Sequence, residues 1–194
     1  MYNKISNYLE GHRRSIEVLA EKMPGPIVQA VEALTETLQG GGKILLMGNG
    51  GSAADAQHFA AEMVGRFLLE RKALPAVALS TDTSILTAVG NDYGFDEVFK
   101  RQVEALARPE DMVVGISTSG HSRNVSLALA AARGAGSRTM ALLGRDGGVI
   151  ATQVDLPLVV PVEHTPHIQE CHLTLIHMLC DLVEQQLFTA TDKP

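Results

Sequence analysis

The chain has no tryptophan, and aromatic residues make up only 4% of its 194 residues. Proteins that bind single-stranded nucleic acid usually stack the bases on aromatic side chains, and nonspecific binding needs a basic surface. Here acidic residues outnumber lysine and arginine by 22 to 16, which gives a formal net charge of −6. We therefore expect no nucleic-acid partner, although backbone N–H groups can still bind an anionic metabolite locally.

Long apolar runs are also absent. A membrane-spanning helix needs about 18 or more consecutive apolar residues, and no such run occurs in the sequence. The first residues, MYNKISNYLEGHRR, lack the apolar core of a signal peptide. We therefore expect no membrane contact and a cytoplasmic location.

Cysteine is scarce, with only Cys171 and Cys180 in the chain. Nine residues apart on one expected helix, they would lie roughly 13 Å apart along its axis. This separation is too large for a disulfide. We expect both to be reduced residues of the core.

No linker, repeat or low-complexity tract divides the sequence, so we expect a single domain over residues 1–194. Residues 1–40 show the spacing of two amphipathic helices, separated by Pro24-Gly25-Pro26 and ended by glycines 40–42. These helices either pack on the sheet of their own subunit or form a helical subunit interface. The α/β core is expected over residues 41–188.

From residue 44 onward, short continuous apolar runs alternate with helical stretches. The runs are Ile44–Met47, Ala76–Leu79, Met112–Ile116, Thr139–Leu143 and Leu156–Val160. The helical stretches are Ser52–Leu69, Thr83–Val89 with Phe95–Ala107, Arg123–Ala135 and Thr165–Phe188. Continuous apolar runs are typical of strands buried on both faces. The alternation predicts a parallel sheet covered by helices on both sides, which is an α/β fold.

Ligands of open parallel sheets bind beyond the carboxyl ends of the strands, so the turns after the apolar runs are the candidate binding residues. After the first run come Asn49, Gly50, Gly51 and Ser52. After the third run come Ser117, Thr118, Ser119 and Ser122. Glycines let the backbone approach an oxyanion, and a serine can cap the following helix. Each turn could be a plain connection, but together they favour a phosphate-binding cradle.

Asn91 and Asp92 follow the helical stretch after the second run. These residue types favour turns for local reasons. The alternative is that their side chains bind substrate hydroxyl groups.

Acid–base or metal-ligand candidates lie on two expected helices. His58 and Glu62 are four residues apart and share a helix face, and His177 lies in the most apolar part of the last helix. The first two could form a surface contact, and His177 could be a satisfied core histidine. Alternatively, His177 meets Glu62 or a metal ion. Gln169 is eight residues before His177, about 12 Å along a straight helix, so one ion reaches both only if their side chains lean together.

The sequence resembles the sugar isomerase (SIS) domain family and, within it, the phosphoheptose isomerases. The resemblance covers almost the whole chain and is carried by GNGGSAADAQHFAAE, TDTSILTAVGNDYGF, GISTSG and IQECHLTLIH. It implies a three-layer flavodoxin-like fold with N-terminal helices and a homotetramer. It also implies conversion of D-sedoheptulose 7-phosphate to D-glycero-D-manno-heptose 7-phosphate, a phosphorylated seven-carbon sugar that enters ADP-heptose and lipopolysaccharide core synthesis.

The resemblance also assigns roles to residues. Ser117, Thr118, Ser119 and Ser122 match the phosphate loop of the family. Its other substrate contacts match Asn49, Gly50, Gly51, Asn91 and Asp92. Glu62 and His177 match the acid–base pair. One Zn²⁺ per subunit, present in some members, matches the ligands His58, Glu62, Gln169 and His177.

Two alternatives stay open. The DnaA initiator-associating proteins resemble much of this chain and look like non-enzymatic binding proteins, but they lack the acidic residue at position 62 and the histidine at position 177. The other alternative is a SIS isomerase for a different phosphosugar, because the residues do not specify the length of the sugar.

Overall fold

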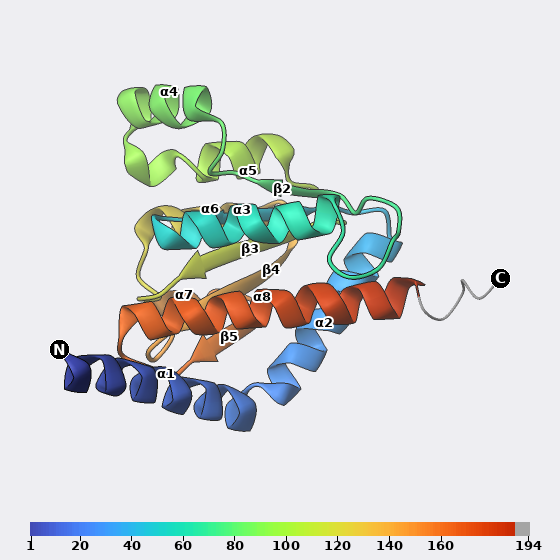
Figure 1. Cartoon of the computed structure of the whole chain (residues 1–194). Helices are drawn as coiled ribbons and strands as arrows, with labels where there is room; N and C mark the ends of the chain where they lie inside the picture. Colours follow the sequence, from blue (N-terminus) through green and yellow to red (C-terminus); the bar gives the residue numbers. More distant parts are fainter. Residues whose placement is uncertain (189–194) are drawn as a thin grey trace.

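In the computed structural model, which describes residues 1–188, helices surround one central sheet of parallel strands (Figure 1). The strands are β1 Ile44–Gly48, β2 Ala76–Ala78, β3 Met112–Ser117, β4 Arg138–Gly144 and β5 Leu156–Val160. The helices are α1 Tyr2–Lys22, α2 Pro24–Gln39, α3 Gly51–Val64, α4 Thr83–Tyr93, the 3₁₀ turn η1 Phe95–Glu97, α5 Lys100–Leu106, α6 Arg123–Gly134, α7 Gly148–Ala151 and α8 Thr165–Phe188. The predicted strand and helix alternation is confirmed.

The strand order in the sheet is β2-β1-β3-β4-β5, and all neighbouring pairs are parallel. From β1 the chain moves outward to β2 and then returns to place β3 on the other side of β1. This order is that of flavodoxin-like folds, as expected, and the crevice beyond the ends of β1 and β3 is where such sheets bind ligands. The fold therefore brings together the two turns that the sequence singled out.

Both faces of the sheet are covered, which explains why its strands are continuously apolar. Leu46 points into a core with side chains of α2, α3 and α8, such as Phe59. Its neighbours Leu45 and Met47 point into a second core with side chains of α5 and α6, such as Leu129. Helix α1 lies outside this layer, along α8 (Figure 1).

The predicted break at Pro24-Gly25-Pro26 is confirmed, since α1 ends at Lys22, and these residues open α2 because proline suits the first turn of a helix. Two local predictions need correction. Asn91 and Asp92 lie in the last turn of α4 rather than after it. The helix expected over Ser52–Leu69 ends at Val64.

The structure bears on two predictions, that the cysteines form no disulfide and that the chain has no membrane-spanning helix. Cys171 and Cys180 are buried on α8 and are free thiols. Burial raises the pKa of the Cys171 thiol to about 11, so it stays protonated at neutral pH. Within residues 1–188, no helix is long and apolar enough to cross a membrane.

Candidate active site

The turns after β1 and β3 lie side by side because the two strands pair in register up to Gly48 and Ile116. The first turn reverses tightly at Gly50, whose φ of 55° lies in the left-handed region that glycine adopts at little cost. Helix α3 begins at the next residue, and α6 begins directly after the second turn. Two helix N-termini, which favour anions, therefore lie beside the same crevice.

A pair of amides joins the two turns. Asn49 Nδ2 donates to Asn124 Oδ1 at 2.8 Å, and Asn124 Nδ2 donates back to Asn49 Oδ1 at 2.9 Å. Asn124 also accepts a hydrogen bond from the Val125 N–H. Sequence reasoning identified Asn49 but missed Asn124, which is buried at the start of α6. Because the pairing uses a donor and the oxygen of Asn49, this side chain also orients the turn.

The second turn gathers hydroxyl groups. Ser117 Oγ lies 2.9 Å from Ser122 Oγ and 3.5 Å from Ser119 Oγ. Ser119 Oγ also accepts the backbone N–H of His121 at 3.1 Å. Thr118 lies between these residues and is half-buried. The cluster presents several small donors at the start of α6 and has the chemistry of an oxyanion cradle without a lysine.

Asn91 and Asp92 do not join this cluster through any hydrogen bond in the described part of the chain. Both are exposed on α4, and Asn91 Nδ2 donates to Asp92 Oδ1 at 2.8 Å. Helix α4 itself buries no residue.

His58, Glu62 and His177 come together from two helices. His58 Nε2 lies 3.0 Å from His177 Nε2 and 3.5 Å from Glu62 Oε1. All three are half-buried, and the His177 ring stacks on that of Phe67 with centroids 5.5 Å apart. His177 is therefore not an isolated core histidine. The residues form a cluster that can hold or move protons.

Gln169 lies nearer the start of α8 than His177 does, and it contacts the start of α3. Its Nε2 would be 2.2 Å from a Cβ at Gly51, so the Gln169 side chain in this conformation lies directly against the start of α3. Helices α3 and α8 thus run in the same direction, with Gln169 beside the start of α3 and His177 beside His58. Since Gly51 and His58 are seven residues apart, Gln169 and His58 are separated by roughly 10 Å along the axis of α3. The described chain does not bring Gln169 to the other three predicted zinc ligands.

A buried ion pair supports the histidine cluster, and sequence reasoning missed it. Arg71 Nε donates to Glu184 Oε1 at 2.9 Å, and both side chains are 1% exposed. The Glu184 carboxylate also accepts the N–H groups of Phe67, Leu68 and Leu69 at 2.7 to 2.9 Å. Burial alone would raise the pKa of Glu184, but these N–H groups and the Arg71 charge hold it below its ordinary value.

The same ion pair explains why α3 ends early. The Arg71 guanidinium donates to the carbonyl groups of Glu62 and Met63, each at 2.8 Å, and so satisfies acceptors that the helix end leaves free. It is thereby linked to the backbone of Glu62, while Glu184 fixes the backbone of Phe67 beside His177. No sequence motif predicts an ion pair between two residues that are more than a hundred positions apart.

Asp55 is a further missed residue. It lies one turn before His58 on α3, and its Oδ2 is buried with no hydrogen-bond partner within residues 1–188. Burial raises the pKa of Asp55 to about 6, against a smaller lowering by His58. Unpartnered buried carboxylates of this kind are more common at functional sites than elsewhere. Its position three residues before His58, on the same side of the expected helix, could have identified Asp55 as a candidate site residue.

Comparison with known proteins shows the family of this chain. Residues 7–144 match the family model described as the SIS domain. The phosphoheptose isomerase of Geobacter sulfurreducens is 62% identical over 188 residues, which cover 97% of this chain and all of that protein. The chain belongs to the SIS domain family. Its close relatives within the family are phosphoheptose isomerases.

Solved structures of SIS-domain proteins also match this chain over nearly its whole length. The phosphoheptose isomerase of Neisseria gonorrhoeae is 49% identical with a TM-score of 0.91, over 95% of this chain and 98% of that one. The enzyme of Francisella tularensis is 38% identical with a TM-score of 0.92, over the same shares.

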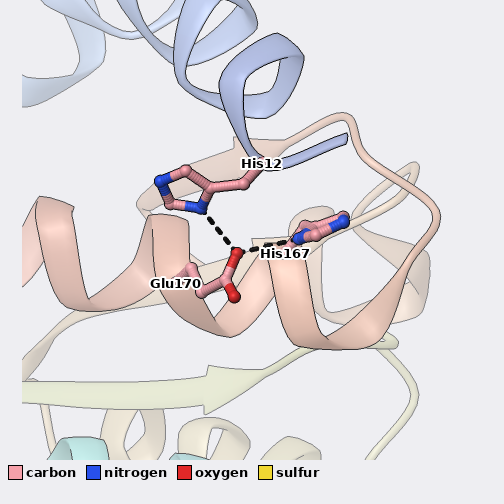
Figure 2. Close-up of side chains that lie close together, drawn as sticks. All are labelled: His12, His167 and Glu170. Atoms are coloured by element: carbon pink, nitrogen blue, oxygen red, sulfur yellow. Dashed lines mark hydrogen bonds and ion pairs between the residues drawn. The ribbon is translucent and has the colours of Figure 1, made fainter. Parts of the chain in front are cut away.

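The structure also places one more buried histidine and a second cluster that contains two histidines. His172 is fully buried on α8, and burial lowers its pKa to about 4, so the ring is neutral at pH 7. His12, His167 and Glu170 form a second histidine and carboxylate cluster between α1 and α8 (Figure 2). In residues 1–188 this is the group of three such side chains whose ligand atoms all lie within 4.8 Å of one another.

Proposed function

We propose that this SIS-domain isomerase converts D-sedoheptulose 7-phosphate to D-glycero-D-manno-heptose 7-phosphate, which would feed ADP-heptose and lipopolysaccharide core synthesis. The observation that carries the proposal is the meeting of His58, Glu62 and His177 in a fold that also gathers two donor-rich turns at the switch point of its sheet. A phosphosugar isomerase needs both a proton-transfer group and an anion cradle. The presence of both favours an enzyme over a binding module.

In this proposal the phosphate binds the hydroxyl cluster of the second turn, and the backbone of the first turn contacts the sugar. The phosphate ligands are Ser117, Thr118, Ser119 and Ser122. The sugar contacts are Asn49, Gly50, Gly51, Ser52, Asn91, Asp92 and Gln169. An anchored phosphate converts part of the substrate-binding energy into correct placement of the reacting carbons.

An aldose–ketose isomerisation moves a proton between two adjacent carbons through an enediol. We assign Glu62 as the base that removes the proton from the sugar carbon and returns it to the neighbouring carbon. His177 then exchanges a proton with the sugar oxygens and serves ring opening. Each general acid–base group contributes roughly 10²- to 10⁴-fold to the rate.

The residues fit a Zn²⁺ ion in part. Two imidazole nitrogens 3.0 Å apart and a nearby carboxylate are a suitable donor set, so His58, Glu62 and His177 would hold the ion. The fourth predicted ligand, Gln169, contacts the Gly51 end of α3. A site with all four ligands therefore requires a different Gln169 rotamer or a contribution from another copy. When bound, Zn²⁺ supplies Lewis-acid stabilisation of charge on oxygen.

The proposal includes a homotetramer in the cytoplasm. Large apolar side chains on the N-terminal helices are exposed, among them Tyr2, Leu9 and Val28. Exposed apolar residues on one segment are typical of surfaces that pair with another copy. Sedimentation velocity on the full chain would give the mass of the assembly, and a monomer at micromolar concentration would contradict this part.

A panel of ketose phosphates tests the substrate. Purified protein is incubated with five-, six- and seven-carbon ketose phosphates, and aldose formation is followed. We expect turnover of the seven-carbon ketose with kcat/KM at least tenfold above the others. Preference for a shorter ketose would identify a different phosphosugar isomerase, and no turnover of any would favour a binding protein.

A further inference from the structure

The second histidine and carboxylate cluster lies at a junction between helices and apart from His58, Glu62 and His177. Glu170 Oε2 lies 2.6 Å from His12 Nδ1 and 2.8 Å from His167 Nδ1 (Figure 2). His12 comes from α1, whereas His167 and Glu170 lie on the first two turns of α8. One carboxylate oxygen thus contacts the imidazole nitrogens of two histidines from different segments of the chain.

The surroundings of the cluster fix its side chains. A Cβ at Gly11 would lie 2.7 Å from His167 Nε2, so the missing side chain lets this ring pack on α1. Glycine inside a helix costs about 1 kcal/mol relative to alanine, so the position is not favourable for α1 alone. Tyr8 Oη donates to Glu170 Oε1 at 3.2 Å, and the Tyr8 ring packs edge-on against His167. Partners of this kind orient metal ligands.

The chemistry of the donor set is that of a transition-metal site. Two imidazoles and one carboxylate are ligands that Zn²⁺ and its neighbours prefer. Without an ion, a proton must lie between each Nδ1 and the shared oxygen, and a divalent cation can replace both. We propose that His12, His167 and Glu170 bind a divalent transition-metal ion, best matched by Zn²⁺, which joins α1 to α8.

This site is separate from the zinc proposed for the reaction. His167 precedes His177 by ten residues on α8, which is about 15 Å along the helix. Glu170 turns toward α1, whereas its neighbour Gln169 turns toward Gly51 on α3. The inference therefore does not depend on the proposed function.

The ion would anchor a weakly packed segment. Only Ser15 and Leu19 of α1 are buried, and its first half exposes Tyr2, Ile5 and Leu9. The contacts of Tyr8 and His12 with α8 are thus a main attachment of this half. An ion that binds only the folded arrangement stabilises it by mass action.

Metal content tests the proposal on the full chain without an affinity tag. Chelator-treated protein is loaded with Zn²⁺, passed through a desalting column and analysed for zinc per chain. His58→Ala is used as the background, because it removes a ligand of the proposed reaction-site ion. His12→Ala and His164→Ala are then compared in this background. His164 is the matched control, since its ring lies 4.7 Å from that of His167 but outside the cluster.

We expect the His58→Ala and His58→Ala/His164→Ala proteins to retain one zinc per chain, and His58→Ala/His12→Ala to lose it. With Co²⁺ as the probe, visible absorption of a four-coordinate site should follow the same pattern, and Zn²⁺ should raise the Tm only where His12 is present. Circular dichroism checks that each variant is folded. Equal zinc content in the His12 and His164 variants, or no zinc in the His58→Ala protein, would overturn the proposal.

Discussion

The molecule contains two clusters of histidine and carboxylate side chains, and they differ in their setting more than in their composition. The first, His58, Glu62 and His177, lies between α3 and α8, two to three turns from the start of α3. The second, His12, His167 and Glu170, lies where α1 meets α8, as Figure 2 shows. The first is the proposed reaction site because it contains the predicted acid–base pair, Glu62 and His177, whereas the second contains neither of these residues.

The clusters also differ in how they are held. A buried ion pair, Arg71 with Glu184, supports the first cluster through the backbone of Glu62 and the ring of Phe67. The second has no such ion pair within residues 1–188 and is held by direct contacts between α1 and α8, among them the hydrogen bond from Tyr8 to Glu170. The first cluster is therefore supported by buried charges that lie outside it, and the second by its own neighbours.

The largest expected difference is in turnover. His177→Asn should lower kcat for heptose phosphate formation by about 10²- to 10⁴-fold, because it removes a proton-transfer group. His12→Asn makes the same replacement in the second cluster and should leave kcat within about threefold, a range below that of any acid–base group. Steady-state assays of both variants measure this, and equal losses would erase the functional distinction between the clusters.

Next in size is the effect of the supporting ion pair on stability. Glu184→Gln leaves the Arg71 charge buried without its partner and should cost about 3–5 kcal/mol in the free energy of unfolding. Glu36→Gln breaks an exposed pair with Arg138 and should cost less than about 1 kcal/mol. Urea unfolding measures both free energies. Similar small losses in the two variants would show that the first cluster has no special support.

A smaller effect concerns Asp55, which borders the first cluster. Its pKa is raised from 3.8 to about 6 in the folded chain, so the folded state holds a proton more tightly than the unfolded state. Stability contributed by the protonated carboxyl is therefore lost as the pH rises from about 4 to about 6. Above this window Asp55→Asn should be more stable than the original chain by roughly 1–2 kcal/mol, after allowance for partial exposure.

Chemical unfolding at several pH values checks the Asp55 prediction. The stability advantage of Asp55→Asn should shrink as the pH falls toward 4. An advantage that is constant with pH would mean that the carboxyl titrates normally in the folded protein.

The smallest effect is expected in the second cluster. Without added metal, His12→Ala should lower stability by only about 0.5–1.5 kcal/mol, since it removes one partly exposed hydrogen bond. Added Zn²⁺ should widen the gap between this variant and the original chain. Thermal unfolding with and without Zn²⁺ measures it, and an unchanged gap would argue against an ion at this junction.

Much of the fold could be predicted from the sequence because its signals are local. The continuous apolar runs located all five strands to within a residue or two, and the ends of β5 and α8 were predicted as found. The boundary that failed most, the end of α3, depends on distant residues. Helix α3 ends at Val64 because Arg71 and Glu184, which are far apart in sequence, organise the segment that follows.

The candidate site was predictable only where a turn after a strand or a spacing along a helix indicated it. The turns at Asn49 and Ser117 were found from their position after strands, and His58 with Glu62 from a spacing of four. The approach of His177 to His58 came from the family resemblance. Asn124, Asp55 and the Arg71 and Glu184 pair were missed because their roles depend on tertiary contacts.

The account depends most on the carboxyl group of Glu62. Its most direct test is the rate at which Glu62→Gln exchanges the reacting sugar proton with solvent deuterium, followed by NMR, with Glu170→Gln as the same change in the second cluster. We predict that exchange falls by about 10²- to 10⁴-fold in Glu62→Gln and stays near the original rate in Glu170→Gln. Undiminished exchange in folded Glu62→Gln would contradict the assignment of the base.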